Sequence, residues 1–351
     1  MRIIADVDTG IDDALALVQL ASAPQLELVG VSASTGNTTA PAAARNSAAV
    51  LALCGREDVP VHLGAPAPLV LPAVTTPETH GADGLGHAVL PRAGAALRDD
   101  DFLEGLWLPE LRSHPGETTL LVTGPLTDLA LALRAEPRLP ELVGQVVIMG
   151  GSFNHPGNTT PTAEWNSWCD PHAAAEVYRA FEGRPAERLP LVCSLAVTES
   201  VVLRPADLDS LAVAAGARAP GLSAATPRDR PPSDTGSPLV DMIADALRFY
   251  FEFHSDWGYG YLAQVHDLLA AQLAIGELGC HATPAWVGVE TDSELTRGTT
   301  VADLRHLWQR PANARIVDRV SPAESLDAFT RAVRRLVRRA GATAALRPAS
   351  R

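Results

Sequence analysis

Residues 3–18 read IIADVDTGIDDALALV: a short apolar strand, an acidic turn and the start of an apolar helix. Ile3 and Ile4 begin the strand, Gly10 allows the backbone to turn sharply, and the run from Ala14 to Val18 continues as a helix. Such a unit is how an open α/β sheet presents functional groups at the carboxyl edge of its strands. We therefore expect an α/β fold with an open, mostly parallel, Rossmann-like sheet flanked by helices.

The acidic turn contains Asp6, Asp8, Asp12 and Asp13. Four carboxylates crowd together only where a cation or shared protons offset part of their charge. The first turn of a helix favours acidic residues, which accounts for Asp12. It does not account for Asp6 and Asp8, which alternate with apolar residues at the end of the strand. Because hard oxygen ligands select Ca²⁺ or Mg²⁺, the turn predicts a divalent-metal site.

The same residues allow one competing interpretation. Asp6-Val7-Asp8-Thr9 begins like the nucleophile motif of haloacid-dehalogenase-type phosphatases, but Gly10 stands where that motif has Thr or Val. Those enzymes generally use a later lysine, and this chain has none. The pair Asp12-Asp13 also has no role in that scheme. We therefore reject a phosphatase of this class.

Composition narrows the class of protein further. The chain has 351 residues, of which 46% are hydrophobic and 20% charged, and these are globular values. A net charge of −13 argues against a nucleic-acid partner, and no apolar run approaches the length of a membrane span. The four scattered cysteines and the absence of a signal-peptide pattern predict free thiols in a reducing compartment. We expect a soluble cytoplasmic protein with no membrane contact.

Short apolar runs alternate with helical patterns along the chain, which predicts a largely parallel sheet. The expected strands are Leu26–Ser34, Thr119–Thr123, Gln145–Met149, Leu189–Leu195 and Trp286–Glu290. No linker divides the chain, so we expect a single domain over residues 1–340, with a frayed tail over 341–351. Leu71–Gly86 and Ala214–Pro238 have the composition of loops, and a loop as long as the second is usually an active-site lid or disordered.

Three further segments carry polar groups that could serve a site. Asn158, Glu164 and Asn166 lie in one polar block and suit a ligand with several hydroxyls. Taken alone, however, the block is better explained as an Asx-rich turn without a ligand. His266-Asp267 enters an apolar helix, where an N-terminal cap with an incidental histidine is the simpler explanation. Tyr250 and His254 are four residues apart and share one helix face, which fits a pocket wall or ordinary core packing.

Together, these segments resemble the inosine-uridine-type nucleoside hydrolases, the nucleoside N-ribohydrolase family. The resemblance extends from Asp6 nearly to the C-terminal helix, and its motifs occur in the family's order. They are the acidic turn, Gly36-Asn37, His80-Gly81 with Asp83-Gly84-Leu85-Gly86, Thr123-Gly124-Pro125-Leu126-Thr127, Met149-Gly150-Gly151, the block from Gly157 to Pro171, His266-Asp267 and the run LTRGTTVAD at 295–303. The resemblance implies the nucleoside hydrolase fold and the cleavage of ribonucleosides to base and ribose.

The resemblance also implies a Ca²⁺ ion held by the carboxylates of Asp8, Asp13 and Asp267 and by the main-chain carbonyl of Thr123. Water and the 2′- and 3′-hydroxyls of the ribose would complete about six to eight oxygen ligands. The ion would orient the sugar and lower the pKa of a bound water, and Asp8 would accept the proton of that water as general base. Asp6 would support the turn from behind.

The remaining implied roles concern the nucleoside. Substrate-binding positions would be Asp12, Asn37, His80, Asn158, Glu164, Asn166, Tyr250 and His254. His266 would donate a proton or a hydrogen bond to the leaving base, with His80 beside it. Purine-specific relatives tend to place Trp at these two histidine positions, so histidine at both favours pyrimidine-accepting or broad specificity. The resemblance further implies a homodimer or homotetramer.

This chain departs from the resembled family at four positions: Thr9 for the usual Pro, Asp128 for Asn, Trp165 for Phe, and Ala196 for Asp. Ala196 bears most on function, because loss of an acidic residue could weaken the support of the site. It keeps open a catalytically weak protein that binds ribose or nucleosides and retains the metal site. A third hypothesis is an N-ribohydrolase of a modified ribosyl compound.

Overall fold

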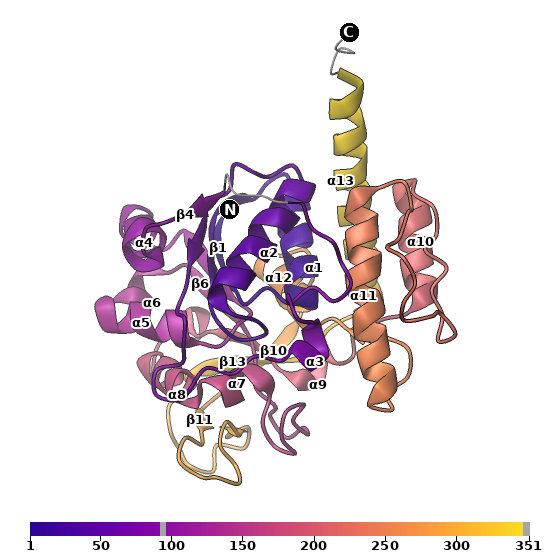
Figure 1. Ribbon diagram of the computed structural model, residues 1–351. Coiled ribbons are helices and arrows are strands. Elements are labelled where there is room, and N and C mark those ends of the chain that lie inside the picture. The colour runs from indigo at the N-terminus through magenta and orange to yellow at the C-terminus, as the bar shows by residue number, and fades with distance from the viewer. Residues whose placement is uncertain (92–95, 347–351) are drawn as a thin grey trace.

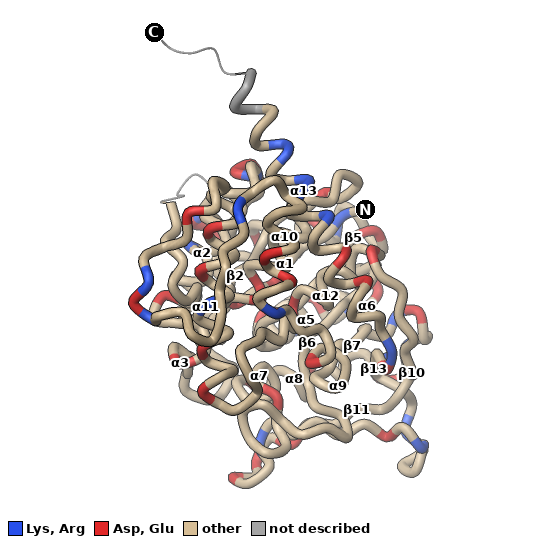
Figure 2. The backbone as a smooth tube through the Cα atoms, turned by 90° about the vertical axis from the view of Figure 1, so that its right-hand side faces the viewer, with Lys and Arg blue, Asp and Glu red and all other residues tan. Residues whose placement is uncertain are grey.

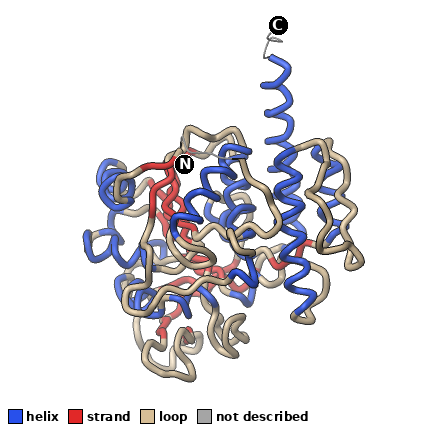
Figure 3. Tube along the Cα trace, viewed as in Figure 1, coloured by secondary structure: helices blue, strands red, loops and turns tan. Residues whose placement is uncertain are grey.

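The computed structural model describes residues 1–91 and 96–346. Within them, nine strands form one sheet in the order β10-β13-β7-β6-β5-β1-β2-β3-β4, with helices on both faces (Figures 1 and 3). Every neighbouring pair is parallel except β10 with β13. The expected α/β fold with an open, mostly parallel sheet is therefore confirmed.

The strands of this main sheet are β1 Arg2–Val7, β2 Glu27–Ala33, β3 Val61–Leu63, β4 Leu97–Arg98, β5 Thr118–Val122, β6 Gln145–Met149, β7 Leu191–Cys193, β10 His281–Ala285 and β13 Ala314–Arg319. Two antiparallel pairs lie outside it: β8 Val202–Leu203 with β9 Ala263–Gln264, and β11 Val287–Val289 with β12 Thr300–Ala302.

The helices are α1 Ile11–Ser22, α2 Ala40–Leu53, α3 Pro77–His80, α4 Leu108–Ser113, α5 Thr127–Ala135, α6 Leu139–Leu142, α7 Trp165–Cys169, α8 Pro171–Ala180, α9 Leu195–Thr198, α10 Pro205–Ala215, α11 Pro238–Asp256, α12 His266–Ala274 and α13 Pro322–Leu346. A π-helical turn at Leu103–Trp107 and a 3₁₀ turn at Ala186–Arg188 complete the list.

The core has two layers, one on each face of the sheet, because successive side chains of a strand point to opposite faces. On β1, Ile3 and Ala5 pack into the layer under α1, α2, α10, α11, α12 and α13. Ile4, between them, packs into the other layer, under α4, α5, α6 and α8. Because helices cover both faces of the sheet, side chains on both sides of β1 are buried, and its sequence is an almost continuous apolar run, as is typical of central parallel strands.

The direction of the chain through the sheet reverses at β1. From β1 the chain continues through β2, β3 and β4 toward one edge, and then returns to β5, β6 and β7 on the other side of β1. In open α/β sheets, ligands bind outside the carboxyl ends of the strands at such a switch point. Here that point lies between the ends of β1 and β5, where Asp8 and Thr123 follow the two strands.

Four of the five expected strands correspond to β2, β5, β6 and β7 of the main sheet. The fifth, Trp286–Glu290, is wrong as a main-sheet strand, because β11 pairs only with β12 in a small antiparallel sheet. The places beyond β7 are taken by β13 and by β10, which were not expected as strands. Strands from both ends of the chain thus join one sheet.

The expected loops are largely irregular. Leu71–Gly86 contains only the short helix α3, and residues 216–237 connect α10 to α11 without a helix or strand. Helix α13 continues to Leu346, past the position near residue 340 at which we expected regular structure to end. The last residues of the expected tail, 347–351, lie outside the described residues. Among the helices of the described part, none is long and apolar enough to cross a membrane.

Candidate active site

The acidic cluster, which we define as Asp8, Asp12, Asp13 and Asp267, lies at the carboxyl edge of the main sheet. Asp8 follows β1, Asp12 and Asp13 are in the first turn of α1, and Asp267 is in the first turn of α12. Helices α1 and α12 pack against each other. Carboxylate oxygens of Asp12, Asp13 and Asp267 lie within 4.8 Å of one another, and all four side chains are buried.

Asn37 and Thr123 hold the carboxylates of the cluster in place. The backbone N–H of Asn37 donates to Oδ2 of Asp8 (2.6 Å), and its side-chain Nδ2 reaches Oδ1 of Asp8 (3.2 Å) and Oδ2 of Asp13 (3.1 Å). The Thr123 hydroxyl donates to Oδ1 of Asp13 (2.7 Å). The structure therefore joins Asn37 and Thr123 to the acidic cluster.

Gly10 is required by close packing. Its φ of −89° and ψ of −161° are open to other residues, so the turn does not need glycine for its backbone angles. A Cβ at Gly10, however, would lie 2.6 Å from Nδ1 of His80 and 2.7 Å from Nδ2 of Asn37. The glycine lets two side chains of the site approach the acidic turn, so the expected role in a sharp turn is replaced by a packing role.

Within residues 1–91 and 96–346, no arginine lines the cavity in which the acidic cluster lies. Burial, together with repulsion from Asp13, raises the pKa of Asp8 well above its usual range, and burial raises the pKa of Asp12 to about 7. Burial and the neighbouring carboxylates likewise raise the pKa of Asp267. Figure 2 shows basic residues on α13, which contacts the Ser22 end of α1, whereas Asp12 and Asp13 lie at the other end. Such a donor set fits a hard divalent cation.

The polar block after β6 is organised by its own side chains. Glu164 caps α7, and its carboxylate accepts the backbone N–H groups of Asn166, Ser167 and Gly151 at 2.7–3.0 Å. The Asn166 amide donates to the main-chain carbonyl of Thr123 (2.6 Å) and to that of Met149 (3.2 Å). This leaves Oδ1 of Asn166 as an acceptor.

Asn158 lies further out on the same block and is exposed. Its Oδ1 accepts the backbone N–H of Trp165 (3.0 Å), so its amide Nδ2 remains a donor. Asn158, Glu164 and Asn166 all line the same cavity as Asp12 and Asp267. The alternative of an Asx-rich turn is right in part, because Asn158 and Glu164 support the loop as well as facing the cavity.

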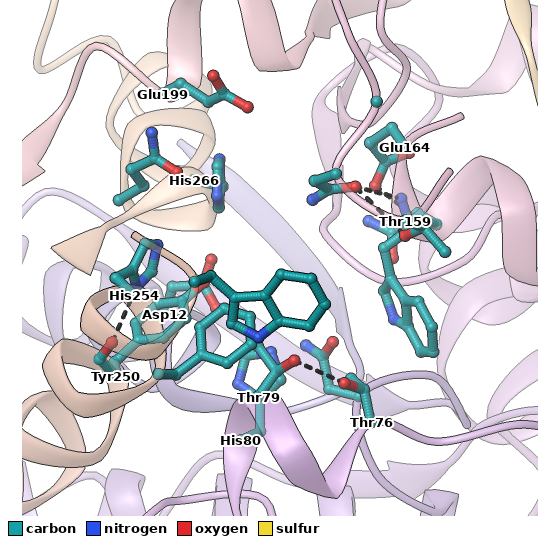
Figure 4. A pocket seen from close by; sticks show the side chains of 18 of the residues that line it. Asp12, Thr76, Thr79, His80, Thr159, Glu164, Glu199, Tyr250, His254 and His266 are labelled. Atoms are coloured by element: carbon teal, nitrogen blue, oxygen red, sulfur yellow. Dashed lines mark hydrogen bonds between the residues drawn. The ribbon is translucent and has the colours of Figure 1, made fainter. Parts of the chain in front are cut away.

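Three buried histidines, His80, His254 and His266, surround the outer part of the cavity (Figure 4). Nδ1 of His80 accepts the backbone N–H of Ile11 (3.0 Å), so the ring proton of neutral His80 is on Nε2. In His254, Nδ1 donates to the main-chain carbonyl of Tyr250 (2.8 Å). Neutral His254 therefore carries its ring proton on Nδ1, unlike His80. His266 shares a hydrogen bond with the Thr198 hydroxyl (2.8 Å).

Burial keeps these histidines neutral. It lowers the pKa of His266 to about 3, with a smaller contribution from His254, and the pKa of His80 to about 3. The pKa of His254 is also lowered by burial. Neutral imidazole offers one N–H donor and one acceptor, so the histidines present oriented hydrogen-bonding groups rather than positive charges.

The cavity above the acidic cluster has a volume of about 440 Å³, the size of a small-molecule site. In Figure 4, Asp12, Tyr250, His254, His266 and Glu199 form one side, and Thr159 and Glu164 the other. All the expected substrate-binding residues line it. Sequence reasoning missed further lining residues: Trp165, Glu199, Phe253, Trp257, Tyr259 and Gln264. Helical spacing from Tyr250 could have found Phe253 and Trp257, but no local signal marks Glu199 or Gln264.

Asp6 lies behind the acidic cluster and does not line the cavity among the described residues. Its Oδ1 accepts the Ser32 hydroxyl (2.8 Å), and its main-chain carbonyl accepts the backbone N–H of Thr123 (2.9 Å). The side chain also faces Asp128, whose Oδ1 accepts the backbone N–H of Ala65 (2.7 Å). Burial raises the pKa of Asp128 to about 6 and, with repulsion from Asp128, raises the pKa of Asp6 further.

Asp128→Asn is expected to stabilise the protein by about 1 kcal/mol near neutral pH. The asparagine amide can donate a hydrogen bond to Asp6 at any pH, whereas Asp128 can do so only when its carboxyl group is protonated. Oδ1 of the new side chain would still accept from Ala65. A carboxyl whose pKa is raised in the folded state destabilises it as pH rises above its unfolded value near 4. The gain should therefore be larger at pH 8 than at pH 5. Thermal melts at both values measure the gain. An equal gain at the two values, or a loss at pH 8, would contradict the raised pKa of these two carboxyl groups.

Ala196 takes no part in the wall of the active-site cavity. It is exposed and lines a second cavity of about 380 Å³ with Phe153, Ser194 and Val197. Of this segment, Thr198 contacts His266 and Glu199 lines the main cavity. The residue that favoured a catalytically weak protein is therefore away from the site.

The comparisons with known proteins agree with this geometry. The chain matches the family model of the inosine-uridine preferring nucleoside hydrolases over residues 3–327. It is 33% identical over 318 residues to the pyrimidine-specific ribonucleoside hydrolase RihA of Salmonella paratyphi C, covering 90% of this chain and 93% of that protein. RihA of Citrobacter koseri is 32% identical over 318 residues, with the same coverage.

Solved structures give the same result for the fold. A plant nucleoside hydrolase, PpNRh1, superposes with a TM-score of 0.79 at 26% identity, covering 95% of this chain and 98% of that one. A purine-preferring ribonucleoside hydrolase from Gardnerella vaginalis superposes with a TM-score of 0.81 at 23% identity, covering 96% and 99%. The chain therefore belongs to the inosine-uridine preferring nucleoside hydrolases and is an enzyme that hydrolyses the N-glycosidic bond of ribonucleosides.

Proposed function

We propose that this nucleoside hydrolase depends on Ca²⁺ and accepts pyrimidine nucleosides, either specifically or within a broad range. The observation that carries the proposal is the acidic cluster itself. Its four carboxylates are buried at the switch point of the sheet, and no arginine lines the cavity in the described ranges, 1–91 and 96–346. Oxygen-only donors of this kind suit a hard cation.

Asp8, Asp13, Asp267 and the main-chain carbonyl of Thr123 would hold the ion. Asp12 would either join them or bind the sugar, because its carboxylate lies within 4.8 Å of those of Asp13 and Asp267. The Thr123 carbonyl has two lone pairs, of which Asn166 occupies one. When bound, Ca²⁺ would supply a Lewis acid that lowers the pKa of water.

Asp8 is proposed as the general base. Its two oxygens are oriented by Asn37, and burial together with repulsion from Asp13 raises the pKa of Asp8, which makes its carboxylate a stronger base. The Asp12 carboxylate, with Asn158, Glu164 and Asn166 on the facing loop, would bind the ribose hydroxyls. Carboxylates close to the sugar also stabilise the positive charge that develops at C1′ as the glycosidic bond breaks.

The leaving base gains negative charge and needs a hydrogen-bond donor. His266 and His80 are proposed to supply it as neutral donors, in agreement with the tautomer that Ile11 imposes on His80. Tyr250 and His254 on α11 would contact the base from the same side. Pyrimidine preference is supported by histidine at positions 80 and 266 and by the pyrimidine-specific RihA relatives.

A substrate panel tests this function. Uridine, cytidine and inosine should each be assayed for release of ribose, beside their 5′-monophosphates. We expect turnover of at least one pyrimidine nucleoside. The kcat/KM should be at least about a hundredfold lower for the nucleotides, because the described residues that line the cavity include carboxylates but no arginine to pair with a phosphate. If no nucleoside in the panel turns over with Ca²⁺ present, the proposal fails.

Three further proposals follow from family membership and sequence. We propose that the enzyme works in the cytoplasm as a homodimer or homotetramer, with residues 1–340 as one catalytic domain. All four cysteines are free thiols, which is compatible with a reducing compartment. Ribonucleosides, rather than nucleic acids or membranes, would be its partners.

A further inference from the structure

Glu199 occupies a position beside the active site that the mechanism does not use. It follows α9 directly, and its neighbour Thr198 is hydrogen-bonded to His266 (2.8 Å). The side chain lines the cavity and is 27% exposed. Figure 4 shows it beyond His266 on the side away from Asp12 and Tyr250, so in this view His266 lies between Glu199 and Asp12.

The backbone around Glu199 is fixed to the segment that carries His266. Strands β8 and β9 pair antiparallel, with Val202 opposite Gln264, and the N–H of Val265 donates to the carbonyl of Val201 (3.1 Å). The carboxylate also meets His155 of the facing loop, with Oε2 of Glu199 at 3.5 Å from Nε2 of His155. The backbone at Glu199 is thus tied to the segment that carries His266, and among the described residues no hydrogen bond to its Oε1 is found.

The acidic cluster, His266 and Glu199 follow one another along one side of the cavity, in the order in which a bound nucleoside would present its ribose, its base and the outer edge of the base. The acidic cluster would take the ribose and His266 the base, and Glu199 lies further out in the same direction. In a pyrimidine nucleoside, the ring position opposite the glycosidic N1 is C4. The substituent on C4 is an amine in cytidine and a carbonyl oxygen in uridine.

We propose that Glu199 is a specificity-determining residue that accepts a hydrogen bond from an exocyclic amine of the base, so that the enzyme prefers cytidine to uridine. The inference rests on the proposed function and adds a substrate class to it. A carboxylate only accepts hydrogen bonds. It therefore pairs with the amine of cytidine but repels the O4 carbonyl of uridine. Hydrogen bonds to a charged partner are the stronger ones.

Glu199→Gln tests the proposal, because glutamine has the same shape and can both donate and accept. The kcat/KM values for cytidine and uridine should be measured for both proteins with Ca²⁺. We expect the cytidine-to-uridine ratio to fall at least about tenfold, with cytidine losing and uridine gaining. Glu78→Gln is the matched control, since Glu78 lines the same cavity from α3, beside Thr79 and His80. It should leave the ratio unchanged.

A second measurement is independent of turnover. Calorimetry should show free cytosine binding more tightly than uracil to the wild-type enzyme, and this preference should disappear in Glu199→Gln. An unchanged ratio in Glu199→Gln, or an equal shift in Glu78→Gln, would overturn the proposal. If no nucleoside is hydrolysed at all, the proposed function fails, while the binding comparison of cytosine with uracil still decides the role of Glu199.

Discussion

Asp8→Asn is expected to lower kcat for nucleoside hydrolysis by about a thousandfold while leaving the fold intact. The amide has the shape of the carboxylate, so Oδ1 can still accept from Asn37, but it cannot take a proton from water. Asp8 also touches Asp13, and the substitution would weaken cation binding in addition. Steady-state kinetics with saturating Ca²⁺ separates the two effects, because a loss through affinity alone is recovered at high Ca²⁺.

Asp128→Asn makes a suitable control for this variant. It is the same chemical change at another fully buried aspartate, but Asp128 lies behind Asp6 and does not line the cavity. We expect its kcat to stay near that of the wild type. Circular dichroism and thermal melts should show that both variants are folded. Near-normal turnover of a folded Asp8→Asn protein would remove Asp8 from the role of general base.

Removing divalent cations is expected to abolish activity and to lower stability markedly. Without a cation, the buried carboxylates of Asp12, Asp13 and Asp267 repel one another, and protons must offset the charge instead. A ligand that binds only the folded state at a thousand times its Kd stabilises it by about 4 kcal/mol. Dialysis against EDTA, followed by scanning calorimetry and activity assays before and after adding back Ca²⁺, measures both effects.

The comparison with other cations makes this experiment specific. Ca²⁺ should restore activity and melting temperature, and Mg²⁺ should do so less well, because it demands stricter octahedral geometry. Asp267→Asn serves as the control, since its melting temperature should respond much less to Ca²⁺. Full activity after chelation would disprove metal dependence, and recovery with Mg²⁺ but not with Ca²⁺ would show that the proposed cation is wrong.

The fold could be predicted from sequence where the signal is local. The strand, turn and helix of residues 3–18 show apolar periodicity directly, and β5 and β6 are compact apolar runs between helices. β10 gives no such signal, because Pro284 interrupts it, and proline is tolerated there only because β10 is an edge strand. The run at 286–290 has the composition of a strand, but which strand it pairs with is decided by tertiary contacts.

The acidic cluster was predictable for a similar reason. Asp8 follows a recognisable strand end and Asp12 and Asp13 begin a helix, so their place at the sheet edge follows from topology. Asp267 follows β9, which lies outside the main sheet, and only the family resemblance indicated its role. Glu199 and Ala196 show the limit of such reasoning. They are three residues apart, yet the first faces the main cavity and the second lines another one. Which way a short helix turns its faces depends on packing, and a single sequence does not carry that information.

The contact between α1 and α12 has a consequence for how the enzyme is made. Three carboxylates of the site, Asp8, Asp12 and Asp13, are synthesised together, whereas Asp267 follows about 250 residues later. At a synthesis rate of about 5–20 residues per second, the nascent chain spends more than about ten seconds without a complete site. A polypeptide released before α12 is translated would lack the fourth carboxylate and His266. Incomplete products are therefore harmless to the nucleosides of the cell that makes them.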